Sequence, residues 1–173
     1  MKYSFLLISI FSFYVSAEEY PSCDFEQSKR VAFSSEKTSD LLTVKAQGEP
    51  CYAGELTISI TMESGEVIHE YKTKFIHWDS RQPDFDIILG NYVNHIIDNA
   101  ITRTSSLPDK FKCEIEEPDC VPYERNVIPL NEYYELKRKN LPMLQHETYY
   151  EGWGAWIYDS ELKKVVLVYE GGV

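Results

Sequence analysis

Apolar and polar residues alternate through much of the first half of the chain. Apolar side chains occupy every second position from 56 to 62, between two threonines and a serine, which is typical of a strand with one buried face. Ser64 and Gly65 supply a turn, and the alternation resumes over residues 67–76. The pattern therefore predicts a β-hairpin at about residues 54–76.

The hydrophobic period lengthens to three or four residues after Pro83. Apolar residues then gather on one side of a helix, and Asp84 is placed to cap the first turn. Leu107-Pro108 lies beyond the end of this pattern. We expect one long amphipathic helix at about residues 84–102.

Strand patterns return near the C-terminus. Two β-rich runs flank a turn at Asp159 and predict a second hairpin at about residues 153–170. Prolines interrupt residues 104–130, and a short helix is predicted at residues 132–139. Two hairpins with a helix between them indicate an α+β fold, in which one antiparallel sheet built from both hairpins packs against the long helix.

The N-terminus has the layout of a secretory signal peptide. Lys2 precedes an uncharged apolar run at residues 3–15, with a cleavage site after Ala17. The run is shorter than the roughly 20 residues that a membrane-spanning helix needs. We predict that residues 1–17 are removed, that residues 18–173 form a single globular domain, and that the protein is periplasmic or secreted, without membrane insertion.

Acidic residues strongly outnumber basic ones. The chain has 28 Asp and Glu against 17 Lys and Arg, a formal charge of −11, which becomes −12 when cleavage removes Lys2. Nucleic-acid binding rests on a basic surplus, so this function is excluded. The charge favours fast capture of a basic partner and discourages self-association.

Four cysteines remain after the predicted cleavage: Cys23, Cys51, Cys113 and Cys120. An even number in an exported chain predicts two disulfides. Three pairings are possible, and the spacing favours Cys23–Cys51 and Cys113–Cys120. Neither a C-x2-C pair nor regular Cys/His spacing is present, so we expect no metal and no cofactor.

Familiar catalytic motifs are missing from the sequence. It has no G-x-S-x-G elbow, and His69, His77, His95 and His146 show no zinc-site spacing. We expect structural or exposed roles for these histidines, with His95 on a solvated helix face. Acid–base chemistry by paired carboxylates, or by His146 with Glu147, is left open as an alternative.

Two segments carry candidate binding residues. Segment 113–120 is acidic, and segment 148–158 combines five large aromatic residues with two glycines. Rigid aromatic side chains anchor a protein partner, or stack on a sugar where amides or acids lie beside them. Trp156 and Tyr158 are expected to point into the core. The predicted binding residues are Tyr149, Tyr150, Glu151, Trp153, Glu114, Glu116 and Glu117.

In size, acidity and predicted disulfides the chain resembles periplasmic inhibitors of lysozyme and immunity proteins against imported toxins. The lysozyme-inhibitor families carry Ser-Gly followed shortly by Tyr on a hairpin. Here Ser64-Gly65 is followed by Glu66-Val67. The resemblance implies a class of function and carries over no site residue.

The sequence therefore predicts an exported acidic binding protein, an inhibitor or immunity protein that captures a basic hydrolase or toxin. Two alternatives stay open: a small envelope enzyme acting on glycan or peptide, and a structural envelope component. A pocket that joins two carboxylates, or His146 to a second titratable group, would favour the enzyme.

Overall fold

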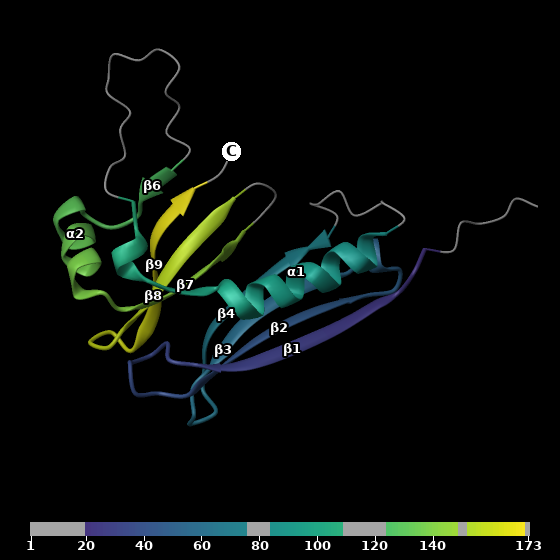
Figure 1. Cartoon of the computed structure of the whole chain (residues 1–173), viewed down its shortest axis with the longest axis horizontal. Helices are drawn as coiled ribbons and strands as arrows, with labels where there is room; N and C mark the ends of the chain where they lie inside the picture. Colours follow the sequence, from purple (N-terminus) through teal and green to yellow (C-terminus); the bar gives the residue numbers. More distant parts are fainter. Residues whose placement is uncertain (1–19, 76–83, 109–123, 149–151, 172–173) are drawn as a thin grey trace, which may run out of the picture.

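The computed structural model describes residues 20–75, 84–108, 124–148 and 152–171. Within these residues the chain forms two antiparallel sheets and two α-helices (Figure 1). The N-terminal sheet has the order β1-β2-β3-β4, formed by Cys23–Val31, Asp40–Gly48, Glu55–Thr61 and Val67–Lys74. The C-terminal sheet has the order β5-β7-β8-β9-β6, formed by Ile101–Arg103, Pro142–Glu147, Trp153–Asp159, Lys164–Gly171 and Glu124–Asn126. The helices are α1, Phe85–Asn99, and α2, Leu130–Lys139.

The first predicted hairpin is confirmed as β3 and β4. Leu56, Ile58 and Ile60 are fully buried, while the threonines and serine between them are half-buried on the other face. Gly65 turns the chain with a φ of 88°, a left-handed conformation that glycine adopts without steric strain. Local alternation was sufficient to predict this element.

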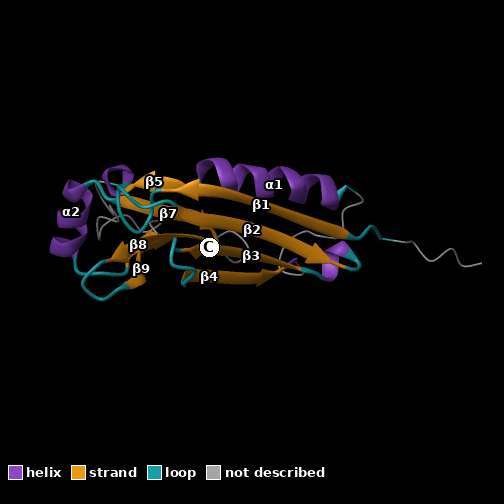
Figure 2. Ribbon diagram, turned by 90° about the horizontal axis from the view of Figure 1, so that it is seen from below, coloured by secondary structure: helices purple, strands orange, loops and turns teal. Residues whose placement is uncertain are grey.

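Helix α1 covers one face of the N-terminal sheet along β1 and β2 (Figure 2). Its buried residues Phe85, Leu89, Val93 and Ile96 join the same core as the apolar residues of β2 and β3. Asp84 precedes the helix as predicted, but no side-chain capping bond forms.

The predicted C-terminal boundary of this helix was wrong. α1 ends at Asn99, and residues 101–103 form strand β5 instead of continuing to 102 as helix. The Gln145 N–H donates to the Ala100 carbonyl at 2.6 Å, and Ile101 pairs with Leu144. Pairing with β7 therefore replaces the last helical turn, because strand hydrogen bonds satisfy its backbone groups.

The second hairpin, β8 and β9, is also confirmed, but the two hairpins do not share one sheet as predicted. The C-terminal sheet instead packs against the N-terminal sheet, with Leu144 and Trp156 in the core that also holds Ile58. Its other face packs against α2, around the fully buried Tyr133 and Tyr169. Two sheets form because each face of the second hairpin finds a separate apolar partner.

Strand β1 has no counterpart in the predictions. Its sequence, CDFEQSKRV, is mostly charged or polar, and only its first residue, Cys23, is buried. Strands at a sheet edge carry charged residues that oppose aggregation, so their hydrophobic alternation is weak.

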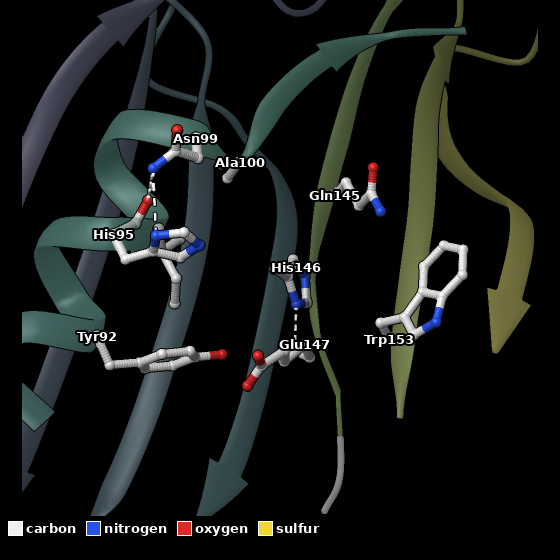
Figure 3. A pocket seen from close by; sticks show the side chains of 9 residues that line it. Tyr92, His95, Asn99, Ala100, Gln145, His146, Glu147 and Trp153 are labelled. Carbon is white, nitrogen blue, oxygen red and sulfur yellow. Dashed lines mark hydrogen bonds between the residues drawn. The ribbon is translucent and has the colours of Figure 1, made fainter. Parts of the chain in front are cut away.

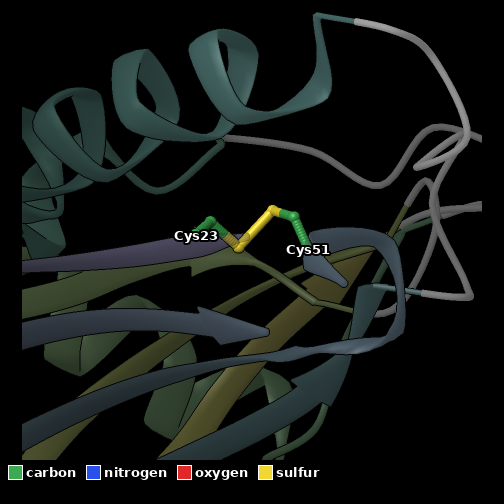
Figure 4. The surroundings of a disulfide bond; sticks show 2 residues. All are labelled: Cys23 and Cys51. Atoms are coloured by element: carbon green, nitrogen blue, oxygen red, sulfur yellow. A yellow bond between two sulfur atoms is a disulfide. The ribbon is translucent and has the colours of Figure 1, made fainter. Parts of the chain in front are cut away.

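One of the two predicted disulfides is confirmed. Cys23 at the start of β1 bonds to Cys51, in the 3-10 turn η1 (Cys51–Ala53), across a sequence separation of 28 residues (Figure 4). Cys113 and Cys120 lie outside the described residues, as do residues 1–17 of the predicted signal peptide. No helix in the described ranges is long and apolar enough to cross a membrane.

The double substitution Cys23→Ser/Cys51→Ser tests the contribution of this bond to stability. Closing a loop of this length stabilises a folded chain by at most about 3.6 kcal/mol through the unfolded state. We expect the variant to lose about 2–3.6 kcal/mol in equilibrium urea unfolding at pH 7. A loss well below 1 kcal/mol would show that the bond does not constrain the unfolded chain.

Candidate functional site

Two histidines that lie 77 residues apart in the chain meet where the two sheets pack together. His69 comes from β4 and His146 from β7, and their Nε2 atoms lie 3.4 Å apart. His69 faces the core because it pairs with Ile60 in the register of β3 and β4. No spacing pattern in the sequence indicates this contact, because only the packing of one sheet on the other brings the two histidines together.

A glycine places the third ring of this cluster. His146 pairs with Gly154 across β7 and β8, and a Cβ at Gly154 would lie 2.4 Å from the ring of Trp156. Because that Cβ is missing, the Trp156 ring folds over Gly154 and stacks on His146, with centroids 4.3 Å apart and planes 15° apart. The predicted inward orientation of Trp156 is thus confirmed.

Both imidazoles are neutral at pH 7. Burial lowers the pKa of His69 to about 4. Burial, reinforced by His69 and opposed by a hydrogen bond to the Glu147 carbonyl, lowers the pKa of His146 to about 4. That bond joins Nδ1 of His146 to the carbonyl oxygen at 2.7 Å, so Nδ1 carries the proton, and the lone pair of Nε2 faces His69.

A pocket of about 430 Å³ lies beside the histidines, between the C-terminal half of α1 and strands β7 and β8 (Figure 3). Pockets of this size hold small ligands or single side chains. The described residues that line it carry aromatic rings, aliphatic groups, amides and one carboxylate. The lining residues are Tyr92, His95, Ile96, Asn99, Ala100, Gln145, His146, Glu147 and Trp153.

Among the described residues that line the pocket, Glu147 is the one that carries a carboxylate. The side chains of Glu147 and Tyr92 point toward each other from β7 and α1 (Figure 3). Burial, and then the negative charge of Glu147, raise the pKa of Tyr92 well above its usual range. The hydroxyl of Tyr92 therefore keeps its proton and remains a donor.

Amide orientation is fixed on the α1 side of the pocket. The Asn99 Nδ2 donates to the carbonyl of His95 at 2.9 Å, which leaves its Oδ1 as an acceptor for a ligand. His95 is exposed on the helix, as predicted.

Trp153 is the predicted binding residue that the structure places in this pocket. Its half-buried ring packs on Tyr169, with centroids 4.6 Å apart. The other predicted binding residues, Tyr149, Tyr150, Glu151, Glu114, Glu116 and Glu117, lie outside the described residues.

Sequence reasoning missed Tyr92, Asn99 and Gln145. Tyr92 was interpreted as part of the apolar stripe of the helix, and no motif marks the two amides. His146 and Glu147 were named only as an acid–base alternative. These two residues are neighbours in the sequence. Both side chains border the pocket because the pocket lies at the edge of β7.

The pocket joins His146 to Glu147 and Tyr92, which is the condition that would favour an enzyme. However, both ring nitrogens of His146 already have partners, one at Glu147 and one at His69. A general base needs a free lone pair within reach of the substrate proton. His146 is therefore not placed to act as a general base in this arrangement. In the described part of the chain, no three His, Cys, Asp or Glu residues are arranged to hold a metal ion.

Comparison with known proteins found no matching family model, no matching curated protein and no matching solved structure.

The histidine pair predicts a dependence of stability on pH. The unfolded chain takes up protons at His69 and His146 below about pH 6.5, whereas the folded pair takes them up only near pH 4. The free energy of unfolding should therefore fall as the pH drops from 7 to 4, by on the order of 2–3 kcal/mol per histidine at most. Urea titrations should show a shallower fall for His69→Gln. The exposed control His95→Gln should keep the wild-type slope, and equal slopes for both variants would refute the assignment.

Gly154→Ala should disturb the cluster, because the new Cβ would overlap the Trp156 ring. We expect a loss of about 1–3 kcal/mol in stability and a changed near-ultraviolet circular dichroism spectrum. Gly90→Ala is the matched control, since its Cβ would lie 3.3 Å from the half-buried ring of Phe25 and alanine favours helix by about 1 kcal/mol. Wild-type stability and spectrum in Gly154→Ala would contradict the stacking argument.

Proposed function

We propose that the protein is an acidic binding protein that captures a basic partner protein, and that the pocket of Tyr92, Glu147 and Trp153 holds a basic side chain of that partner. The supporting observation is one carboxylate set between two aromatic rings in a pocket of about 430 Å³. The predicted export of the chain places this capture in the periplasm or outside the cell.

The pocket has the three kinds of group that bind a cation with a long apolar stem. Glu147 offers charge-assisted hydrogen bonds, and the faces of Tyr92 and Trp153 attract a positive charge. The amide oxygens of Asn99 and Gln145 are acceptors for further N–H groups. Arginine fits best, because its planar guanidinium stacks on a ring and binds a carboxylate through two N–H groups.

The neutral state of the histidines supports this assignment. An imidazolium at His146 would repel a cation bound beside it, but the low pKa keeps the ring uncharged at pH 7. The local field therefore comes from Glu147, and the formal charge of −11 on the whole chain adds long-range attraction. In this proposal the acidic segment 113–120 adds to the attraction of the basic partner.

A glycan ligand would use the same rings and amides without needing the carboxylate charge. The dependence of binding on charge therefore distinguishes a glycan from a cationic side chain. The probe is the peptide acetyl-Gly-Arg-Gly-amide, titrated into ¹⁵N-labelled protein and followed by NMR. The matched probe carries citrulline, which has the shape of arginine without its charge.

We expect the arginine peptide to bind with a Kd in the millimolar range, about −4 kcal/mol, and to shift the amides of β7 and the end of α1. The citrulline peptide should bind at least 10-fold more weakly. Glu147→Gln should weaken arginine binding about 5- to 10-fold. Glu161→Gln makes the same charge change at an exposed residue between β8 and β9 and should have no effect.

Equal binding of the two peptides, or equal affinity of the two variants, would refute a cation pocket. Chitooligosaccharide binding that survives Glu147→Gln would establish the glycan ligand instead. For the intact partner, columns of wild type and Glu147→Gln should differ in one basic protein, retained by the wild type at low salt and released at high salt.

A further inference from the structure

Strand β1 is an open edge of the N-terminal sheet. It pairs with β2 over nine residues, Cys23 to Val31, and no strand in the described ranges pairs with its other edge. Such an edge presents a row of backbone N–H and C=O groups that can pair with another strand.

The sequence of β1 is complementary to itself in the antiparallel direction. With Gln27 opposite Gln27 of a second copy, Asp24 lies opposite Arg30 and Arg30 opposite Asp24. Opposite charges that face each other across strands stabilise the pairing, whereas like charges oppose it. The full nine residues are in register in this arrangement.

The two faces of β1 are clearly distinguished. Phe25 lies against Gly90 of α1, and the Lys29 ammonium lies 3.2 Å from the Asp98 carboxylate near the end of α1. Odd-numbered residues therefore face the helix, and Asp24 and Arg30 share the opposite face. A two-fold axis perpendicular to the sheet preserves these faces, so both copies place α1 on the same side.

An apolar groove runs beside the open edge. Between β1 and α1 lies a space of about 340 Å³, bordered by Phe25, Ile87, Gly90 and Val93 among others. Ile87, which borders this space, is 64% exposed. α1 contacts both β1 and β2, and neighbouring strands lie about 4.8 Å apart. The α1 helices of two copies paired through β1 would thus lie about 10 Å apart, a distance at which helices pack.

We propose that two copies of this chain associate through their β1 edges, antiparallel and centred on Gln27, into one continuous eight-stranded sheet with the two α1 helices side by side. The contact covers both the open strand edge and the exposed Ile87. It does not depend on the ligand proposed for the pocket.

Charge balance permits this contact in an acidic protein. Strand β1 has two acids, Asp24 and Glu26, and two bases, Lys29 and Arg30, so the paired strands are neutral. Repulsion between the remaining charges is screened at 0.15 M salt, where the screening length is about 8 Å. The Tyr92 pocket lies on the other side of α1 and stays open in both copies.

The first test is sedimentation velocity of oxidised residues 18–173 at 0.15 M salt, over about 1–200 µM. We expect a reversible dimer. Asp24→Arg and Arg30→Asp each place like charges opposite each other and should weaken it at least 10-fold. The double variant Asp24→Arg/Arg30→Asp restores the opposite charges and should restore the dimer. Circular dichroism and urea unfolding establish that each variant is folded.

A cysteine test reads the register directly. Gln27→Cys places two thiols opposite each other on the two-fold axis, so mild oxidation should give a covalent dimer. Ser28→Cys is the control, because Ser28 faces Glu26 of the other copy and should cross-link much more slowly. Any of three results would overturn the proposal. They are a wild type that stays monomeric to 200 µM, a dimer whose affinity the Asp24 and Arg30 variants do not change, and equal cross-linking of the two cysteine variants.

Discussion

The contact between Trp156 and His146 is the constraint on which the arrangement of the two sheets depends. It exists because Gly154 has no Cβ, which lets a large ring lie flat on its own strand and reach across to the next. His69 completes the contact from the other sheet. A bulkier residue at 154 would push the ring outward and hold the sheets apart. The absence of one methyl group therefore sets the position of the Trp156 ring, which packs on His146 and on His69 of the other sheet.

Polar groups in this region are used in a consistent way. The histidines bring hydrogen-bonding capacity without charge, because burial favours their neutral forms. Glu147, by contrast, is exposed at the pocket mouth. The neutral ring of His146 and the carboxylate of Glu147 thus border the same pocket. In the proposed function, the surplus of acids elsewhere acts on the approach of a basic partner more than on the final contact.

Both hairpins and most of α1 were predictable from sequence, because each follows from a periodic pattern of neighbouring residues. The assembly of the hairpins was not, because the same alternation is compatible with one sheet or two. Strand β1 lacks a buried face, and its pairing with β2 carries no hydrophobic signal. The site depends on contacts such as His69 with His146, whose separation of 77 residues leaves no local trace. Trp153 could be identified because a short segment rich in both aromatic residues and glycine is uncommon. Asn99 and Gln145 are ordinary amides that no motif marks.

Helix α1 forms a wall of two hollows at once. Tyr92 and Asn99 border the pocket at β7, while Ile87 and Gly90 border the groove at β1. The helix is a rigid rod, so any small shift or rotation that widens one hollow alters the other. Only a ligand that prefers one position of the helix would link the two places, and each site would then change the affinity of the other by the same factor.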